Sequence, residues 1–120
     1  MKRKTNTKFY TFCQNNSGGF FKGSDDSGIS EYVIIEAINA QQANKKAEEI
    51  GIYFDGCSEG NDCPCCGDRW YPVSESDGYK TPLIYGKSVY ETEKDIYMES
   101  CFIHFINGEK KKIEFKNEKA

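Results

Sequence analysis

The chain has 120 residues, 38% of them hydrophobic and 14% aromatic, and a formal net charge of −3. This length suits one domain with one core, and eight Phe, eight Tyr and one Trp supply enough buried area to favour a folded domain over disorder. The acidic balance argues against a protein whose main task is to coat nucleic acid.

The sequence also indicates a compartment. It has no run of about 18 apolar residues that would span a membrane, and no apolar segment follows its charged N-terminus as in a signal peptide. We therefore expect a cytoplasmic protein, whose six cysteines are metal ligands or reduced thiols. A disulfide between Cys13 and Cys101 stays open as an alternative. We expect a single domain over residues 1–120, with frayed ends at 1–7 and 117–120.

Two segments rich in β-forming residues predict the first strands. Residues 8–13 form the first strand, and the polar run at 14–19 ends it. Residues 31–37 contain four consecutive apolar or aromatic side chains, which predict a central strand that is covered on both faces.

The next segment predicts one helix. Asn39 is a good N-cap, and Gln42 stands three residues later, as in a capping box. Gly51 occupies the C′ position at the other end. Four residues at spacings of three and four form one apolar face: Ala40, Ala43, Ala47 and Ile50. The small alanines favour close packing of this helix on a sheet.

The segments after the helix predict further strands. Residues 70–73 predict an edge strand, because Pro72 cannot donate a hydrogen bond to a neighbour. Residues 83–90 predict a strand that is broken at Gly86. The order of elements predicts an α+β fold with a mostly antiparallel sheet, one main helix and a cysteine-rich zinc-knuckle loop.

The end of the chain predicts a β-hairpin. Residues 98–106 and 111–115 flank Asn107-Gly108, the strongest short-range hairpin signal. A two-residue turn pairs Ile106 with Glu109, His104 with Lys111 and Phe102 with Ile113. The expected core face is Phe102, Ile106, Ile113 and Phe115. The opposite face is partly apolar, which allows a homo-oligomer.

Four of the six cysteines lie within ten residues, at Cys57, Cys63, Cys65 and Cys66. The run 63–67 has the form C-P-x-C-G of a zinc knuckle, in which two thiolates three positions apart reach one tetrahedral metal. We expect a structural zinc ion held by Cys63 and Cys66, with Cys57 as the third ligand. Cys65 belongs to the same candidate set, although it points away from the metal in the usual turn of this motif.

The fourth zinc ligand and the metal itself have alternatives. The fourth ligand stays open among Cys13, Cys101, His104, Asp62, Asp68 and a second chain. The alternative without metal is a cluster of reduced cysteines in a tight loop. Redox chemistry is disfavoured, because a redox C-x-x-C stands at a helix N-terminus and the residues after this motif predict a turn.

Two segments are candidates for ligand or partner binding. Asn15, Asn16, Gly18 and Gly19 offer amide donors and bare backbone that suit a phosphate, although a plain turn also fits. Residues Asp68, Arg69 and Trp70 either form a local ion pair and cap the knuckle, or present Arg and Trp to a ligand.

Several stretches together resemble a group of small proteins that bacteriophages encode. The stretches are 8–12, 14–19, 32–37, 43–54 and 62–70. The resemblance covers roughly residues 8–73 and includes the motif D-C-x-C-C-G-D-R-W. It implies a phage gene that is expressed in the bacterial cytoplasm, and it transfers no catalytic residues.

Three functions follow as hypotheses. The first is a non-enzymatic phage accessory protein, stabilised by zinc, that counteracts host antiviral defence by sequestering a nucleotide messenger or blocking a host protein. It is motivated by the missing catalytic constellation, since no paired carboxylates stand out and there is a single histidine, by the acidic balance, and by the resemblance to phage proteins. The second is a zinc-ribbon-like adaptor for nucleic acid or the transcription machinery. The third is a thiol-dependent enzyme that uses Cys65 or Cys66.

Overall fold

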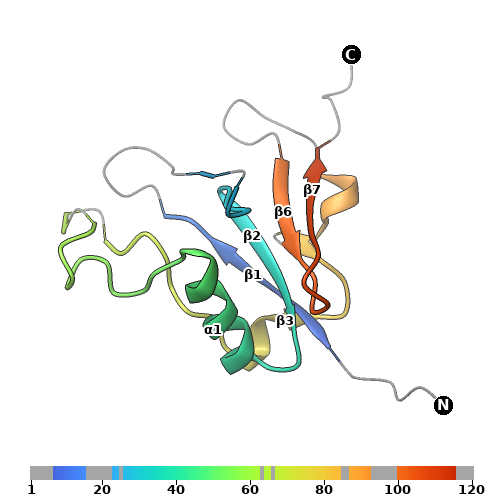
Figure 1. Cartoon of the computed structure of the whole chain (residues 1–120), viewed down its shortest axis with the longest axis horizontal. Coiled ribbons are helices and arrows are strands. Elements are labelled where there is room, and N and C mark those ends of the chain that lie inside the picture. Colours follow the sequence, from blue (N-terminus) through green and yellow to red (C-terminus); the bar gives the residue numbers. More distant parts are fainter. Residues whose placement is uncertain are drawn as a thin grey trace.

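The computed structural model of the protein describes residues 7–15, 23–24, 26–62, 64–65, 67–84, 87–92 and 100–115. Five strands form one mixed sheet in the order β3-β1-β2-β6-β7 (Figure 1). Their bounds are Lys8–Cys13 for β1, Tyr32–Ala37 for β2, Gly78–Tyr79 for β3, Ser100–His104 for β6 and Lys110–Glu114 for β7. Strands β2 and β6 run parallel, and the other three pairs are antiparallel. The predicted α+β class is confirmed, with a mixed sheet.

Strand β2 is the centre of the sheet, as its apolar run predicts. It pairs with β1 from Lys8 opposite Ala37 to Cys13 opposite Tyr32. On its other edge, Val33 lies opposite Phe102 of β6. Five of its six residues are buried, because both of its faces are covered.

The remaining elements are short. They are helix α1 (Ala40–Ile50), the 3₁₀ turns η2 (Glu75–Asp77) and η3 (Val89–Glu91), and a two-stranded ribbon of β4 (Leu83–Ile84) and β5 (Lys87–Ser88). The ribbon replaces the single broken strand predicted at 83–90, and residues 85–86 lie outside the described part of the chain. No helix of the described residues is long and apolar enough to cross a membrane.

Helix α1 begins and ends where its capping residues predict. The Asn39 side chain accepts a hydrogen bond of 2.8 Å from the Gln42 backbone N–H. The Gln42 side chain reaches one residue further back than a capping box requires, and accepts from the N–H of Ile38 at 2.9 Å. Gly51 ends the helix with φ of 115°, a left-handed conformation that glycine adopts at low cost.

The predicted edge strand at residues 70–73 is wrong. Both backbone groups of Val73 bind the side chain of Asn44 in helix α1, at 2.8 and 3.0 Å. The segment therefore pairs with the helix instead of a strand, and Trp70 is 2% exposed in the core.

The C-terminal hairpin forms, but its predicted register is off by one residue. Phe102 lies opposite Lys112 and Cys101 lies opposite Ile113. The turn contains three residues, with Phe105 N–H bound to Glu109 O at 2.8 Å and Gly108 at φ of 98°. Since one step of register exchanges the two faces of a strand, Phe102 and Ile106 do not share a core face with Ile113 and Phe115 as predicted, although Phe102, Ile113 and Phe115 are all buried. Ile113 and Phe115 pack with Cys101 and Ile103, and Ile106 is exposed.

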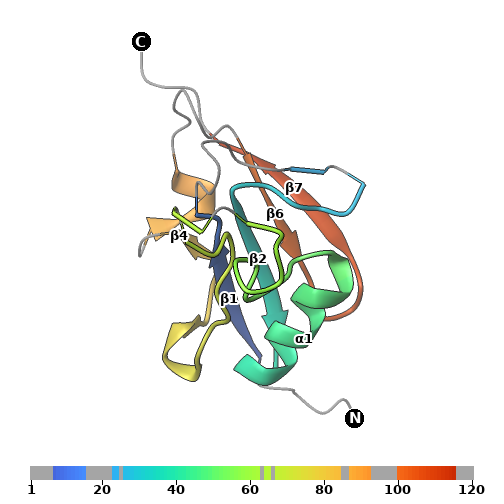
Figure 2. The same cartoon turned by 90° about the vertical axis from the view of Figure 1, so that its left-hand side faces the viewer.

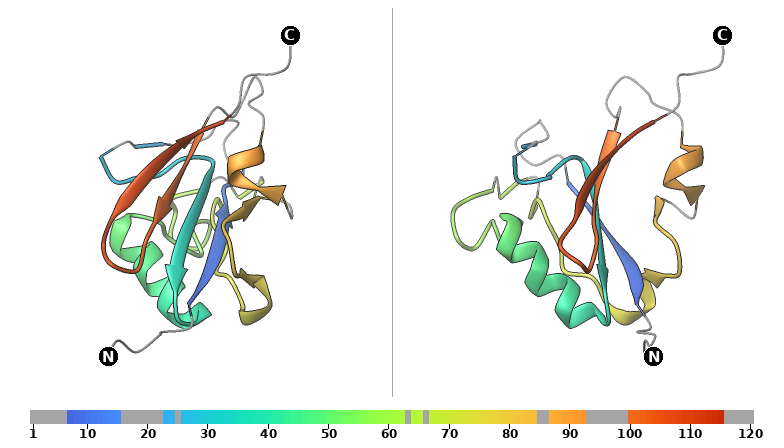
Figure 3. Two further views of the ribbon diagram at one scale, coloured as in Figure 1. Left: turned by 90° about the vertical axis from the view of Figure 1, so that its right-hand side faces the viewer. Right: turned by 45° about the vertical axis from the view of Figure 1, so that its right-hand side comes forward.

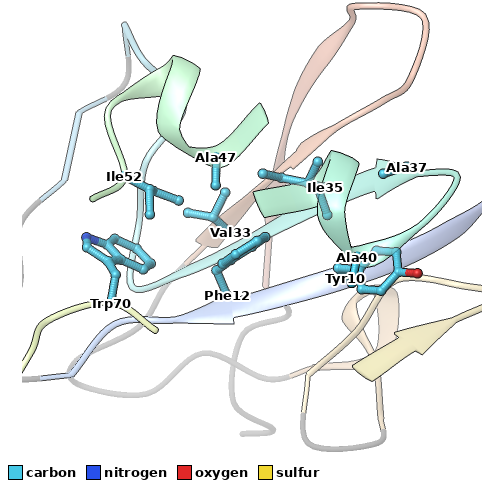
Figure 4. Close-up of a cluster of buried hydrophobic side chains, with 10 residues drawn as sticks. Tyr10, Phe12, Val33, Ile35, Ala37, Ala40, Ala47, Ile52 and Trp70 are labelled. Carbon is cyan, nitrogen blue, oxygen red and sulfur yellow. The ribbon is translucent and has the colours of Figure 1, made fainter. Parts of the chain in front are cut away.

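Each face of the sheet carries its own core. Helix α1 lies on one face and the β4–β5 ribbon with η3 on the other (Figures 2 and 3). Figure 4 shows the helix-side cluster, in which side chains of β1 and β2 meet the alanines of α1. Trp70 closes this cluster beside Ile52. The opposite cluster joins Tyr32 and Ile34 to Ile84 and Val89. The helix-side core supports the cysteine-rich segment of the chain that is described below.

Candidate functional site

Residues 55–69, which we call the cysteine loop, extend from the helix-side core beyond the end of α1 (Figure 1). The backbone reverses at Asp55, whose φ is 58°. The Gly56 carbonyl then accepts hydrogen bonds from the N–H groups of Asn61 and Asp62, at 2.8 and 3.1 Å. A side chain at position 56 would collide with the Asp62 carboxylate, so only glycine fits there. These hydrogen bonds place Asp62 next to Gly56, so residues 56–62 form a closed turn.

A buried ion pair anchors the loop on the core. The Asp62 carboxylate accepts hydrogen bonds from the Arg69 backbone N–H and the Tyr53 hydroxyl, both at 2.8 Å. It also lies 3.6 Å from Arg69 Nε, and the two side chains are 0% and 3% exposed. Buried charges of this kind need compensating partners, which each residue finds in the other. Burial raises the pKa of Tyr53, and its bond to Asp62 raises it further, so the hydroxyl remains a donor.

The same arginine ties the loop to the end of strand β1. Its Nη1 donates to Gln14 Oε1 at 2.8 Å, and Gln14 in turn donates from its amide group to the Ser30 carbonyl at 3.2 Å. The Asn15 N–H donates to the Arg69 carbonyl at 2.7 Å. The side chain of Asn15 also donates to the Asp68 carbonyl at 3.0 Å. The C-terminal end of the cysteine loop is thereby fixed to the end of strand β1.

The cysteines lie on this fixed loop. Cys57 is half-buried, and its N–H donates to the Asp68 carboxylate at 2.9 Å. Cys65 is exposed. Cys63 and Cys66, the first two predicted zinc ligands, lie outside the described residues. Within the described ranges, no three His, Cys, Asp or Glu residues come together as a metal site.

The candidates for a fourth zinc ligand are dispersed. Asp62 is bound to Arg69 and Tyr53, and Asp68 to the backbone of Cys57. Cys101 lies in the core cluster on the other face of the sheet. His104 Nε2 is 2.8 Å from the Gly28 carbonyl oxygen. Cys13 is reduced and lies at the end of β1.

The thiols outside the cysteine loop stay protonated near neutral pH. Burial raises the pKa of Cys13 to about 11, and the nearby carboxylates of Glu31 and Asp77 add to this shift. Burial raises the pKa of Cys101 to about 12. Because the thiolate is the reactive form, neither cysteine is an activated nucleophile.

The predicted ligand-binding residues occupy different environments. Arg69 and Trp70 are each 2% exposed, so they support the loop and offer no surface to a ligand. Asn15 and Asp68 are half-buried and bind the backbone that joins β1 to the loop. Asn16, Gly18 and Gly19 lie outside the described residues.

Sequence reasoning missed two features. The first is the buried network, in which Gln14 meets Arg69 across 55 positions and Tyr53 meets Asp62 across nine. No sequence signal pairs these residues, because charged side chains are exposed by default. The second is a hollow beside the segment 23–30, whose only sequence signal is a loop rich in serine and glycine.

This fold and this anchored loop define a small α+β domain with a cysteine-rich extension. The chain belongs to a domain family of unknown function, DUF7296, whose model matches residues 7–120. Neither the curated proteins nor the solved structures contain a match to the chain.

Proposed function

We propose that this protein is a small phage accessory protein that acts by binding, without catalysis, in the cytoplasm of the host bacterium. It counteracts antiviral defence by blocking a host protein or by sequestering a nucleotide signal. One observation carries the proposal: the cysteine loop is anchored by the buried Asp62–Arg69 pair, while Cys65 is at its surface. The resemblance of the sequence to phage proteins supplies the biological context.

A structural zinc ion stiffens the loop in this proposal. Four thiols within ten residues form a donor set that suits zinc, which prefers thiolate sulfur in structural sites. Cys57, Cys63 and Cys66 are the proposed ligands, with Cys65 as the other candidate. A loop that zinc holds rigid loses less conformational freedom when it binds a partner, which favours affinity.

The exposed side of the loop suits a protein partner. Tyr71 is the second residue after the loop and is 54% exposed. A Cβ at Gly67 would lie 3.2 Å from the Tyr71 hydroxyl, so the ring lies against the loop. Tyrosine combines apolar area with a polar tip and is enriched in protein interfaces. Tyr71 is therefore the proposed anchor for a host protein.

Native mass spectrometry tests the zinc part of the proposal. Protein purified without added metal is measured before and after mild acid, together with Cys57→Ser and the matched control Ser58→Ala. We expect one zinc ion per chain in the wild type and in Ser58→Ala, its release by acid, and its loss in Cys57→Ser. An additional nucleotide-sized mass supports sequestration. A metal-free wild type would remove the zinc premise.

Phage infection tests the binding part. The protein is expressed in bacteria that carry a defence system, and phage plating is measured for the wild type, Tyr71→Ala and Tyr90→Ala. Tyr90 is 48% exposed in η3, on the opposite side of the sheet, and serves as the control. We expect Tyr71→Ala to lose the restored plating and Tyr90→Ala to keep it. Turnover of a nucleotide or peptide by the purified protein would overturn the proposal.

A further inference from the structure

A row of four side chains crosses the sheet near the start of strand β1, and we call it the Glu36 row. Tyr79 of β3 lies opposite Phe9 of β1, and Phe9 lies opposite Glu36 of β2. The parallel register of β2 with β6 continues the row at Phe105, one residue past the end of β6. Residues that lie opposite one another share a face of the sheet. This face carries the β4–β5 ribbon, because Phe9 and Phe105 pack against the core on that side.

The ribbon leaves the Glu36 row partly open to solvent. It meets β1 two residues further along, where the Thr11 hydroxyl donates to the Leu83 carbonyl at 2.6 Å. In Figure 3 the ribbon and η3 lie beside the upper part of the sheet, whereas β1 begins at the bottom. Tyr79 is 47% exposed, and the other three members of the row are half-buried.

The carboxylate of Glu36 is held in one position by two hydrogen bonds. Its Oε2 accepts from the Thr7 hydroxyl at 2.6 Å, and its Oε1 accepts from the Ile106 backbone N–H at 3.1 Å. These bonds join the start of β1 to the segment after β6 across the end of β2. An ionised carboxylate offers about four acceptor sites, so it can accept further hydrogen bonds from a cation. Because the group is already fixed, binding costs it little conformational freedom.

Aromatic and apolar side chains lie next to this carboxylate. The rings of Phe9 and Phe105 come from the two strands that flank β2, and they meet edge to face with centroids 6.1 Å apart. Ile106, whose N–H binds the carboxylate, is 38% exposed. Strand β7 adds Lys111 to this face and the turn before it adds Glu109, two charges that offset each other. A single carboxylate beside aromatic rings attracts a cation with an apolar stem and repels a phosphate.

We propose that the Glu36 row, together with Ile106, is a docking surface for an arginine side chain of a partner protein. The guanidinium pairs with the Glu36 carboxylate, and apolar residues beside the arginine contact Tyr79 and Ile106. Arginine fits better than lysine, because its planar group binds a carboxylate through two parallel hydrogen bonds and stacks on aromatic rings. A symmetric dimer would bring one Glu36 from each copy into the same interface, so the charge favours a different protein. The inference goes beyond the proposed function, since this surface lies on the other face of the sheet from the core that supports the cysteine loop.

The test is a titration with two short peptides that is followed by amide chemical shifts in NMR spectra. One peptide carries a single arginine between two valines, and the other carries citrulline, the neutral isostere of arginine, at the same position. We expect the arginine peptide to shift the amides of Glu36, Phe105 and Ile106. The citrulline peptide should bind at least about tenfold more weakly, because it lacks the charge that pairs with the carboxylate.

Glu36→Gln is the diagnostic variant, because its amide oxygen still accepts from the Ile106 N–H while the charge is removed. Glu49→Gln on the exposed side of α1 is the matched control. We expect Glu36→Gln to lower the affinity for the arginine peptide about tenfold and to leave the affinity for the citrulline peptide unchanged. Glu49→Gln should change neither affinity.

Four results would each overturn the inference: equal affinity for the two peptides, an unaffected Glu36→Gln, shifts confined to another surface, or no shift at about 10 mM peptide. A dimer in sedimentation experiments that Glu36→Gln abolishes would overturn it as well, since the occupant would then be a second copy of the chain. Zinc binding and the Tyr71→Ala plating assay do not involve the Glu36 row, so the two proposals fail separately.

Discussion

His104 shows how one buried side chain carries a pH dependence. It is 8% exposed, and its Nε2 faces the Gly28 carbonyl oxygen at 2.8 Å. A carbonyl only accepts, so Nε2 carries the proton of the neutral ring. Burial lowers the pKa of His104 below its ordinary 6.5, and the ammonium groups of Lys110 and Lys46 lower it further, whereas the bond to Gly28 opposes this shift.

This pKa predicts a loss of stability in mild acid. Between the lowered folded-state pKa and 6.5, the unfolded chain binds more protons than the folded chain, so stability rises with pH. The stabilisation that comes from the lowered pKa of His104 is fully present above pH 6.5, and it is lost as the pH falls through the folded-state pKa. His104→Gln keeps a donor for Gly28 and removes the titration. Urea unfolding over this range should show a pH slope in the wild type that is absent in the variant; equal slopes would contradict the prediction.

The two thiols outside the cysteine loop predict an order of reactivity. The pKa of Cys13 is raised to about 11 and that of Cys101 to about 12, and Cys101 is buried in the core whereas Cys13 is exposed at the end of β1. We expect iodoacetamide to modify Cys101 at least tenfold more slowly in the native protein than in urea, and Cys13 to react faster than Cys101 because its side chain is exposed. Peptide mass spectrometry of timed samples gives both rates. Native and urea rates that coincide for Cys101 would contradict its burial in the core.

Among the elements, the cysteine loop depends most on a single interaction. Asp62→Ala removes the acceptor of the Tyr53 hydroxyl and of the Arg69 N–H, and leaves the buried guanidinium without its counter-charge. Breaking a buried pair in this way costs about 3–5 kcal/mol of unfolding free energy. The expected result is a loss of that size in urea unfolding, followed by the fluorescence of Trp70, the only tryptophan.

Glu59→Ala is the control for this experiment, because Glu59 is exposed in the same loop. A change within about 0.5 kcal/mol is expected there. If Asp62→Ala were as mild as the control, the ion pair would have no part in anchoring the loop. Arg69→Met combined with Asp62→Ala should recover part of the loss, since an apolar side chain needs no counter-charge.

Local signals in the sequence predicted local structure. Asn39 and Gly51 fix the ends of helix α1 through bonds to neighbours within a few residues, so its bounds followed from the chain itself. Asn107-Gly108 correctly predicted a turn, but the predicted length of two residues is wrong. A two-residue and a three-residue loop both accommodate this pair, and the choice moves Cys101 and Phe102 to opposite faces.

Features that join distant residues were not predictable. The parallel pairing of β2 with β6 connects Val33 to Phe102 across most of the chain, and an apolar strand does not specify its neighbour. Arg69 is buried because the fold brings Gln14, Tyr53 and Asp62 together around it. The sequence therefore predicted the position of the cysteine loop but not how it is held.

At the scale of the molecule, the sheet separates two cores that share the central strand β2. Val33 and Ile35 face the helix side, whereas Tyr32 and Ile34 face the β4–β5 side. Among the described residues, Cys101 is the one cysteine in either cluster of buried side chains. The described cysteines of the loop belong to neither cluster, so the cohesion of the sheet does not depend on them.

This separation predicts that zinc acts locally. Removing the proposed zinc with a chelator should accelerate amide hydrogen exchange in residues 56–62 and leave the exchange of β2 and β6 unchanged. The physical reason is that Trp70, Ile52 and the alanines of α1 hold the base of the loop without a metal, whereas residues 56–62 contribute no side chain to this core. Cys57→Ser should reproduce the same pattern without chelator. Unfolding of the whole sheet on chelation would instead place this domain with small metal-dependent folds, in which binding and folding are one event.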